Sequence, residues 1–169
     1  ALIITLTGPD RPGMVSAVSD CAAAHGANWL DSLMANFDNT FAGIVHLQVP
    51  SAQVAALTAA LQALDAVDFR ITVTQPAGGV QAAQRQVELE LVGHDRPGII
   101  RAISGQLAAL GVGIHKLQTH TSSGAMSGEQ LFHMQARLGM PQGLDADTLR
   151  NGLESLANEL MVDLRFDQP

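Results

Sequence analysis

The sequence predicts an α+β fold made of two βαββαβ units, each with an antiparallel sheet and both helices on one face of that sheet. Three observations support this prediction: a hexapeptide that recurs 85 residues later, apolar residues that alternate along short segments, and apolar residues spaced by four along longer ones. Together they indicate that one structural unit is present twice in the chain.

The recurring hexapeptide is GPDRPG at 8–13 and GHDRPG at 93–98. The two 19-residue segments that begin with these motifs, 8–26 and 93–111, are identical at 10 positions. Self-similarity at a fixed offset is typical of internal repeats. We therefore interpret the chain as a tandem duplication.

The first copy opens with alternating apolar residues at 2–6, which predict a strand with one buried face. After the motif, apolar residues spaced by four at 14–22 predict an amphipathic helix. This helix closes at Gly26, as a glycine cap would close it. The corresponding residues of the second copy are 87–91, 99–107 and Gly111.

A second strand, a third strand, a second helix and a last strand complete each copy. In the first copy they are marked by 28–36, by Val45, Leu47 and Val49, by Leu57, Leu61 and Leu64, and by Phe69, Ile71 and Val73. The second copy has 112–121, then Phe132, Met134 and Ala136, then Leu149, Leu153 and Leu156, and finally Val162, Leu164 and Phe166. The second helices are expected to begin at Pro50-Ser51 and at Asp145.

The third strands match at an offset of 87, which predicts a second hairpin loop two residues longer than the first. This match makes His46 and His133 equivalent, on a sheet face exposed to solvent. A βαββαβ order gives a ferredoxin-like unit with a four-stranded sheet. We expect a first domain at 1–75, a linker at 76–86 and a second domain at 87–169, because the segment between the copies contains Pro and a Gly pair.

Charge and composition exclude several function classes. The formal net charge is −7, and neither half has a cluster of Lys and Arg that could neutralise phosphates, so direct nucleic-acid binding is not expected. We expect no membrane span, because no apolar run is long enough for one, and we expect no signal peptide. The single cysteine, Cys21, cannot form an internal disulfide, so we expect a reducing, cytoplasmic location.

Catalytic and metal chemistry have no support in the pattern of residues. No Ser/His/Asp order, phosphate-binding loop or metal-ligand cluster stands out, so we expect no enzyme activity, no metal and no cofactor. Cys21 and Trp29 are each predicted to pack in the core.

The turn between the first strand and first helix of each copy has two interpretations. Pro suits a first helical turn, and Gly permits close backbone approach. Asp10 and Asp95 are placed where a carboxylate can cap a helix N-terminus. The turn is therefore either a structural cap or a site for a small polar ligand.

GPDRPGMVSAVSD at 8–20 and GHDRPGIIRAISG at 93–105, within a βαββαβ order, resemble the ACT domain, a small regulatory module of amino-acid metabolism. The resemblance extends over almost the whole chain and implies a tandem ACT protein that regulates without catalysing a reaction. It also implies a small amino acid of the glycine or serine class as ligand, a transcription regulator as protein partner, and a homodimer. Similar turns occur in the ACT segments of phosphoserine phosphatase, formyltetrahydrofolate deformylase and uridylyltransferases. A regulatory fragment of such an enzyme and a ligand-free interaction module therefore remain as alternatives.

The resemblance also implies the ligand-binding residues. ACT ligands lie between two units, held by the turn of one unit and the start of the second strand of the other. An Asn begins that strand in serine-binding members; the first copy has Asn28 there, whereas the second has Gly113. We therefore expect one competent site, with the other weaker or empty. The candidate residues are Asp10, Arg11, Gly13, Met14 and Asn28, with Asp95, Arg96, Gly98 and Ile99 in the second copy.

Overall fold

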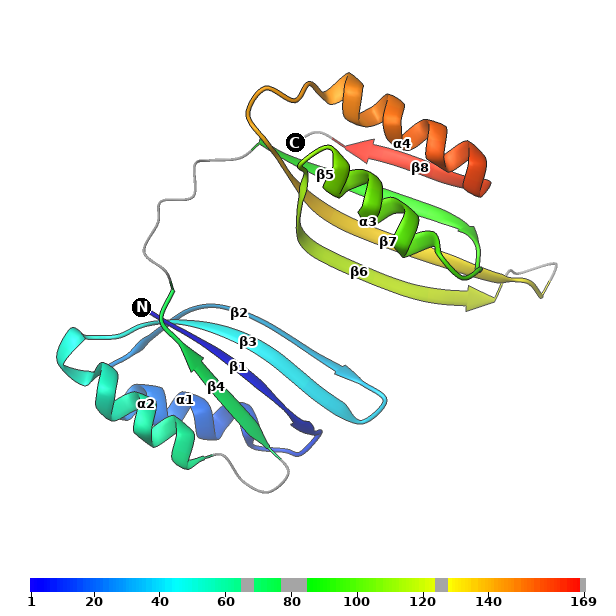
Figure 1. The fold of residues 1–169 in the computed structure, drawn as a ribbon. Helices are drawn as coiled ribbons and strands as arrows, with labels where there is room; N and C mark the ends of the chain where they lie inside the picture. The colour runs from blue at the N-terminus through cyan, green and yellow to red at the C-terminus, as the bar shows by residue number, and fades with distance from the viewer. Residues whose placement is uncertain (65–68, 77–84, 124–127, 168–169) are drawn as a thin grey trace. The chain divides into compact units, whose positions relative to one another are not determined.

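A computed structural model describes residues 1–64, 69–76, 85–123 and 128–167. The chain divides into two compact units, Ala1–Gly79 and Val80–Pro169. Each unit has two helices on one face of a four-stranded sheet (Figure 1). The predicted α+β fold of two ferredoxin-like βαββαβ units is confirmed.

The described residues of unit 1 form four strands, two α-helices and one short 3₁₀ turn. They are β1 (Leu2–Pro9), α1 (Met14–Ala24), β2 (Asn28–Phe37), β3 (Thr40–Gln48), the turn η1 (Ser51–Gln53), α2 (Val54–Ala63) and β4 (Arg70–Thr74). The strand order is β2-β3-β1-β4, and all neighbours are antiparallel. The β2–β3 hairpin turns at Asp38 and Asn39, whose φ angles of 46° and 62° are typical of a tight hairpin turn.

Unit 2 repeats this order with a longer hairpin and a longer second helix. Its elements are β5 (Arg85–His94), α3 (Ile99–Ala109), β6 (Gly113–Ser123), β7 (Gln130–Met140), α4 (Ala146–Leu160) and β8 (Val162–Asp167). The strand order is β6-β7-β5-β8, again antiparallel throughout.

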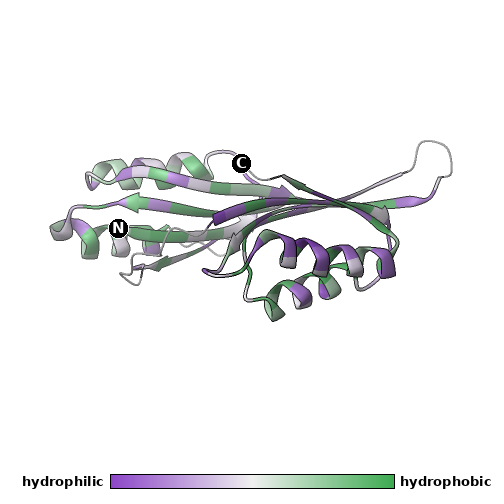
Figure 2. Ribbon diagram, turned by 90° about the horizontal axis from the view of Figure 1, so that it is seen from above, coloured by the Kyte–Doolittle hydropathy of each residue, from purple (hydrophilic) through white to green (hydrophobic). Residues whose placement is uncertain are grey.

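Each sheet buries its helix-facing side chains in a core. Hydrophobic and hydrophilic residues alternate along the strands, as Figure 2 shows, so that one sheet face is apolar. The fully buried side chains include Leu2, Ile4, Leu47, Leu57 and Leu61 in unit 1, and Leu89, Leu91, Ile103, Leu107, Leu138, Leu149 and Leu153 in unit 2. Trp29 and Cys21 pack against the first core as half-buried residues, which confirms their predicted role. Burial raises the pKa of the Cys21 thiol, so the thiol is the favoured form at neutral pH.

The first helix of each unit ends as the sequence predicts. Gly26 and Gly111 have φ angles of 65° and 69°. Around each glycine, two backbone hydrogen bonds close the helix: Ala27 N to Ala22 O with Gly26 N to Ala23 O, and Val112 N to Leu107 O with Gly111 N to Ala108 O. This is the Schellman arrangement, and the left-handed glycine makes it possible.

The second helices begin differently. Asp145 caps α4, where it accepts from the Thr148 backbone N–H at 2.7 Å and from the Thr148 hydroxyl at 2.6 Å. The helix α2 follows the η1 turn and has no side-chain cap. The predicted start at Asp145 is confirmed, whereas Pro50 and Ser51 precede α2 by one 3₁₀ turn.

The matching of the third strands at an offset of 87 is wrong. Leu2 pairs with Leu47 and its counterpart Val87 pairs with Leu138, so β3 and β7 correspond at an offset of 91. Because β2 and β6 still correspond at 85, the second hairpin is six residues longer, not two. Consequently His46 corresponds to Arg137, and not to His133. Alternation has a period of two, so an error of four residues leaves the apolar pattern intact and cannot be detected from it.

The predicted linker at 76–86 overlaps a strand. Arg85 and Gln86 pair with Met140 and Gly139, so β5 begins two residues earlier than expected. The intervening residues 77–84 lie outside the described part of the chain.

Candidate functional site

The two DRPG turns have nearly the same backbone geometry. Gly13 and Gly98 stand at the N-caps of α1 and α3 in the left-handed conformation, with φ angles of 94° and 99°. Their carbonyls accept the first helical hydrogen bonds, from Ala17 N and Ala102 N, both at 2.9 Å. Apart from the adjoining residues of the chain, no atom lies within 4 Å of a Cβ atom built on either glycine. The positive φ angle, and not close approach of another part of the protein, is therefore what requires glycine here.

The carboxylates of these turns do not cap the helices, contrary to one prediction. Neither α1 nor α3 receives a side-chain hydrogen bond at its N-cap, and neither has an acidic residue in its first turn. The reason is the glycine at the N-cap position, which places Asp10 and Asp95 three residues before it. The positive end of each helix is consequently not compensated by a carboxylate of its own turn.

Asp10 instead contacts the end of the neighbouring hairpin. Its backbone N–H donates to Asn39 O at 3.0 Å, and its carboxylate accepts from the side-chain amide of Asn36. Sequence reasoning missed Asn36, because the bond joins positions 26 residues apart and depends on the hairpin register. Asp10 itself remains exposed.

The second turn is tied to a different part of its unit. The Asp95 backbone N–H donates to Gln130 O at 2.8 Å, and His94 Nδ1 lies 3.4 Å from a Glu129 carboxylate oxygen. Arg96 donates to the carbonyl of Leu160 and, at 3.5 Å, to that of Glu159, the last residues of α4. A cation at these carbonyls compensates the negative end of the helix. Arg96, predicted to bind ligand, therefore makes a structural contact.

Asn28 and Asp10 lie at opposite ends of the same sheet. Asn28 begins β2 and pairs with Gln48, whereas Pro9, next to Asp10, pairs with Thr40. Their partners on β3, Gln48 and Thr40, are eight residues apart along that strand, or roughly 27 Å at about 3.4 Å per residue. One amino acid cannot contact Asn28 and Asp10 of the same unit. Because both residues belong to unit 1, a site that uses both must take them from unit 1 of two copies of the chain.

The remaining candidates differ between the copies. Met14 is half-buried at the start of α1, whereas the Ile99 side chain is 3% exposed and belongs to the core of unit 2. Ile99 could therefore offer a ligand only its backbone. Gly113, the counterpart of Asn28, pairs with Gly139 and has no side chain to offer.

The described residues were also considered for metal-ligand clusters and for membrane-spanning helices. In the ranges that the structure describes, no group of three or more His, Cys, Asp or Glu side chains could hold a metal ion. Within the same ranges, no helix is both long and apolar enough to cross a membrane.

Unit 1 is similar to a known protein family. A family model of the ACT domain matches residues 1–74, which confirms the resemblance drawn from the DRPG turn and the order of elements. No curated protein matches the chain.

Solved structures extend the similarity to both units. A crystal structure of a protein of unknown role from Galdieria sulphuraria is 28% identical, with a TM-score of 0.83, and the match covers 99% of this chain and 97% of that one. A second structure is provisionally assigned as a glycine cleavage system transcriptional repressor; it is 20% identical, with a TM-score of 0.72 and the same coverage. At this identity the second structure shows that the fold is shared.

Proposed function

We propose that this protein is a non-enzymatic regulator that binds a small amino acid of the glycine or serine class and acts on a transcription regulator through protein contact. In this proposal it regulates glycine cleavage from the cytoplasm and works as a homodimer. The fold shared with the provisionally assigned repressor over 99% of the chain supports the proposal, as does the ACT match of unit 1.

The observation that carries ligand binding is the uncapped N-terminus of α1 beside Asp10. The first turn of α1 has no side-chain cap and no acidic residue, so its amides can receive the carboxylate of an amino acid. Asp10 is exposed and can receive the ammonium group. The bond from Asn36 holds this carboxylate in place.

We propose that Asn28 from unit 1 of a second copy of the chain completes this site. The strand β2 is a sheet edge. If two such edges pair antiparallel, the start of one strand lies beside the end of the other, which brings Asn28 next to the turn that carries Asp10. The second turn is the weaker candidate, because Arg96 is engaged with α4 and Gly113 stands in place of Asn28.

Thermal unfolding with a panel of amino acids tests ligand binding. A ligand that binds only the folded protein stabilises it by about 2.7 kcal/mol at 100 times its dissociation constant. We expect glycine or serine to raise the unfolding midpoint, Asp10→Ala and Asn28→Ala to abolish the rise, and the matched variant Asp95→Ala to keep most of it. The absence of a shift with every amino acid at millimolar concentration would contradict the proposal.

A pull-down tests the regulatory part. We expect the protein to retain a transcription regulator, with an amount that depends on the amino acid. Tight, salt-sensitive binding of DNA by the protein alone would contradict action through a protein.

The ligand-free interaction module is the second candidate, favoured by the contact of Arg96 with α4. It predicts that Asp10→Ala and Asn28→Ala leave partner binding unchanged whatever amino acid is present. Finding a catalytic domain in the same reading frame would favour the third candidate, a regulatory fragment of an enzyme of the phosphoserine phosphatase or uridylyltransferase type.

A further inference from the structure

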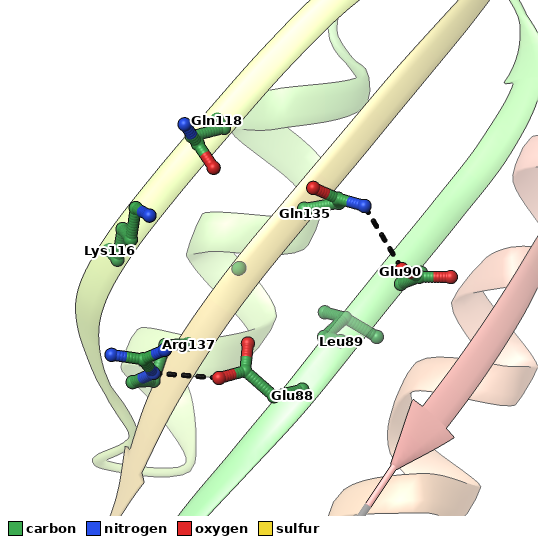
Figure 3. A pocket seen from close by; sticks show the side chains of 8 residues that line it. Glu88, Leu89, Glu90, Lys116, Gln118, Gln135 and Arg137 are labelled. Carbon is green, nitrogen blue, oxygen red and sulfur yellow. Dashed lines mark hydrogen bonds and ion pairs between the residues drawn. The ribbon is translucent and has the colours of Figure 1, made fainter.

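The sheet face of unit 2 that points away from its helices carries a charged groove, which we call the β5–β7 groove. Its volume is about 340 Å³, and its polar lining consists of Glu88 and Glu90 on β5, Lys116 and Gln118 on β6, and Gln135 and Arg137 on β7. All six side chains project from the same face of the sheet in Figure 3, while Leu89 lies behind it.

Two bonds fix the centre of the groove. Arg137 Nε lies 2.6 Å from Glu88 Oε1, and Gln135 Nε2 donates to Glu90 Oε1 at 3.0 Å. Both bonds appear as dashed lines in Figure 3. The side chains of Arg137 and Gln135 on β7 therefore point towards β5. The other side of the groove, at β6, is lined by Lys116 and Gln118.

The charges in the groove are not all compensated. Lys116 stands directly opposite Arg137 in the strand register, and like charges in that position destabilise a sheet. Arg137 has Glu88 as its counter-ion, whereas the half-buried Lys116 has no ion pair among the described residues. An anion between Lys116 and Arg137 would remove this repulsion.

The opposite side of the groove needs a cation. Glu90 is half-buried and accepts only from the neutral amide of Gln135, so its negative charge has no counter-ion within the described part of the chain. Arg165 faces Glu90 across the β5–β8 pair, but the two side chains form no ion pair. A cationic group above Gln135 would meet this carboxylate.

The fold does not require this arrangement, because unit 1 lacks it. By strand register, Lys116 and Arg137 correspond to Asp31 and His46, and Glu90 corresponds to Thr5. The two units have the same strand order without sharing these charges. This set of charges is therefore a property of unit 2.

We propose that the β5–β7 groove binds a zwitterion of dipeptide size. Its carboxylate contacts Lys116 and the free guanidinium nitrogens of Arg137, with Gln118 as a further donor, and its ammonium group contacts Glu90. The strands β5 and β6 flank β7, so their backbones are about 10 Å apart. Glu90 is opposite Gln135 and Lys116 is opposite Arg137, so the two charged residues are also about 7 Å apart along the strands, and the diagonal between their backbone positions is about 12 Å. An extended dipeptide spans at most about 7 Å, and a hydrogen bond of about 2.9 Å at each end brings its reach to about 13 Å. This site is separate from the turn with Asp10 and does not depend on it.

The probe for this proposal is L-alanyl-L-alanine, titrated into the full chain and followed by backbone amide chemical shifts. We expect shifts on β5, β6 and β7, and binding about tenfold weaker when the peptide carries an N-acetyl or a C-terminal amide group, since each removes one charge. Lys116→Gln and Glu90→Gln should each weaken binding of the uncapped peptide about tenfold as well. Both positions are on the surface of the sheet, so their thermal midpoints report whether the fold is kept.

Two controls distinguish binding in this groove from binding elsewhere on the protein and from binding of single amino acids. Arg70→Gln removes an exposed cation from the sheet of unit 1 and should leave peptide binding unchanged. Free glycine and serine form the second arm: binding that requires Lys116 would assign the groove to single amino acids and overturn the dipeptide assignment. Equal binding by capped and uncapped peptides, unchanged binding by Lys116→Gln, or no chemical shift changes at millimolar peptide would overturn the site altogether.

Discussion

The two units have the same strand order and an apolar core on the helix-facing side of the sheet, but the open faces of their sheets carry different side chains. In unit 1, Leu33 and Ile44 are 54% and 43% exposed on that face. The residues in register with them in unit 2 are Gln118 and Gln135. The helix-facing side of a sheet must stay apolar for the unit to fold, whereas the open side can change without loss of the core. Differences in function between the two copies are therefore expected on the open faces and in the turns.

The two cores differ in the size of individual side chains, and a change at one position is matched by an opposite change at its neighbour. Gly43 and Met134 occupy the same position on the third strand, and the edge-strand residues beside them are Met34 and Thr119. A Cβ atom on Gly43 would lie 2.9 Å from Met34 Cγ, so the methionine of unit 1 fills the space beside a glycine. At this pair of positions each unit has one methionine, on the edge strand β2 in unit 1 and on β7 in unit 2. Close packing favours such paired changes.

The largest change in stability is expected when a core residue of one unit is replaced by its counterpart from the other. Leu107 of α3 is 1% exposed, and its counterpart in α1 is Ala22, 3% exposed. We expect Leu107→Ala to destabilise unit 2 by about 2–5 kcal/mol through a cavity. Ala22→Leu should destabilise unit 1 by about 1–3 kcal/mol through overpacking. Urea unfolding with amide hydrogen exchange measures both, and a cost below about 1 kcal/mol for Leu107→Ala would show that the α3 site collapses readily.

The next effect tests what the two DRPG turns have in common. Gly13→Ala and Gly98→Ala should each destabilise the protein by about 1–2 kcal/mol, because an L-residue is strained at positive φ. Gly105 is the control: it lies within α3, and outside the backbone of that helix no atom lies within 4 Å of a Cβ built on it, so Gly105→Ala should stabilise by about 0.8–1 kcal/mol. Thermal unfolding distinguishes the two outcomes, and equal effects at Gly98 and Gly105 would disprove the role of φ.

The sequence predicted the fold because each element carries its own local signal. Alternating residues in β1 and β5, the four-residue spacing in α1 and α3, and the cap at Asp145 all act over a few residues. The register of β7 could not be obtained in this way, since the length of the hairpin decides it and the apolar pattern is the same after a shift of four residues. That His46 and Arg137 occupy equivalent positions in the two units follows only from the strand register.

The contacts around the candidate site were predicted only in part for the same reason. The glycines of the turns are visible in the sequence, because a left-handed N-cap selects glycine locally. The contacts of Asp10 with Asn36 and of Arg96 with α4 join distant segments and have no local signal. The β5–β7 groove combines residues from three strands, so its charges meet only once the register is known.

A smaller effect concerns the second helices, which start differently in the two units. Hydrogen bonds from the Thr148 hydroxyl and backbone N–H hold the pKa of Asp145 below its ordinary value. Because the folded-state pKa is lowered, the stabilisation is present above the unfolded pKa of about 3.9 and is lost as the pH falls through the folded value. Asp145→Ala should lower the thermal midpoint at neutral pH and match the wild type in strong acid. Ser51→Ala, at the uncapped α2 start, should change neither midpoint.

The smallest effect concerns the ion pair that only unit 2 has. Arg137 and Glu88 are 46% and 44% exposed, so their coupling energy should be about 0.2–1 kcal/mol in a double-mutant cycle of alanine variants. About 1 M salt should remove most of it, since the Debye length then falls to about 3 Å. The corresponding pair in unit 1, His46 and Ile3, should show no salt-dependent coupling. A coupling well above 1 kcal/mol would mean that the pair stabilises the sheet; a small one means that the charges of the open face are available to a ligand at little cost to the fold.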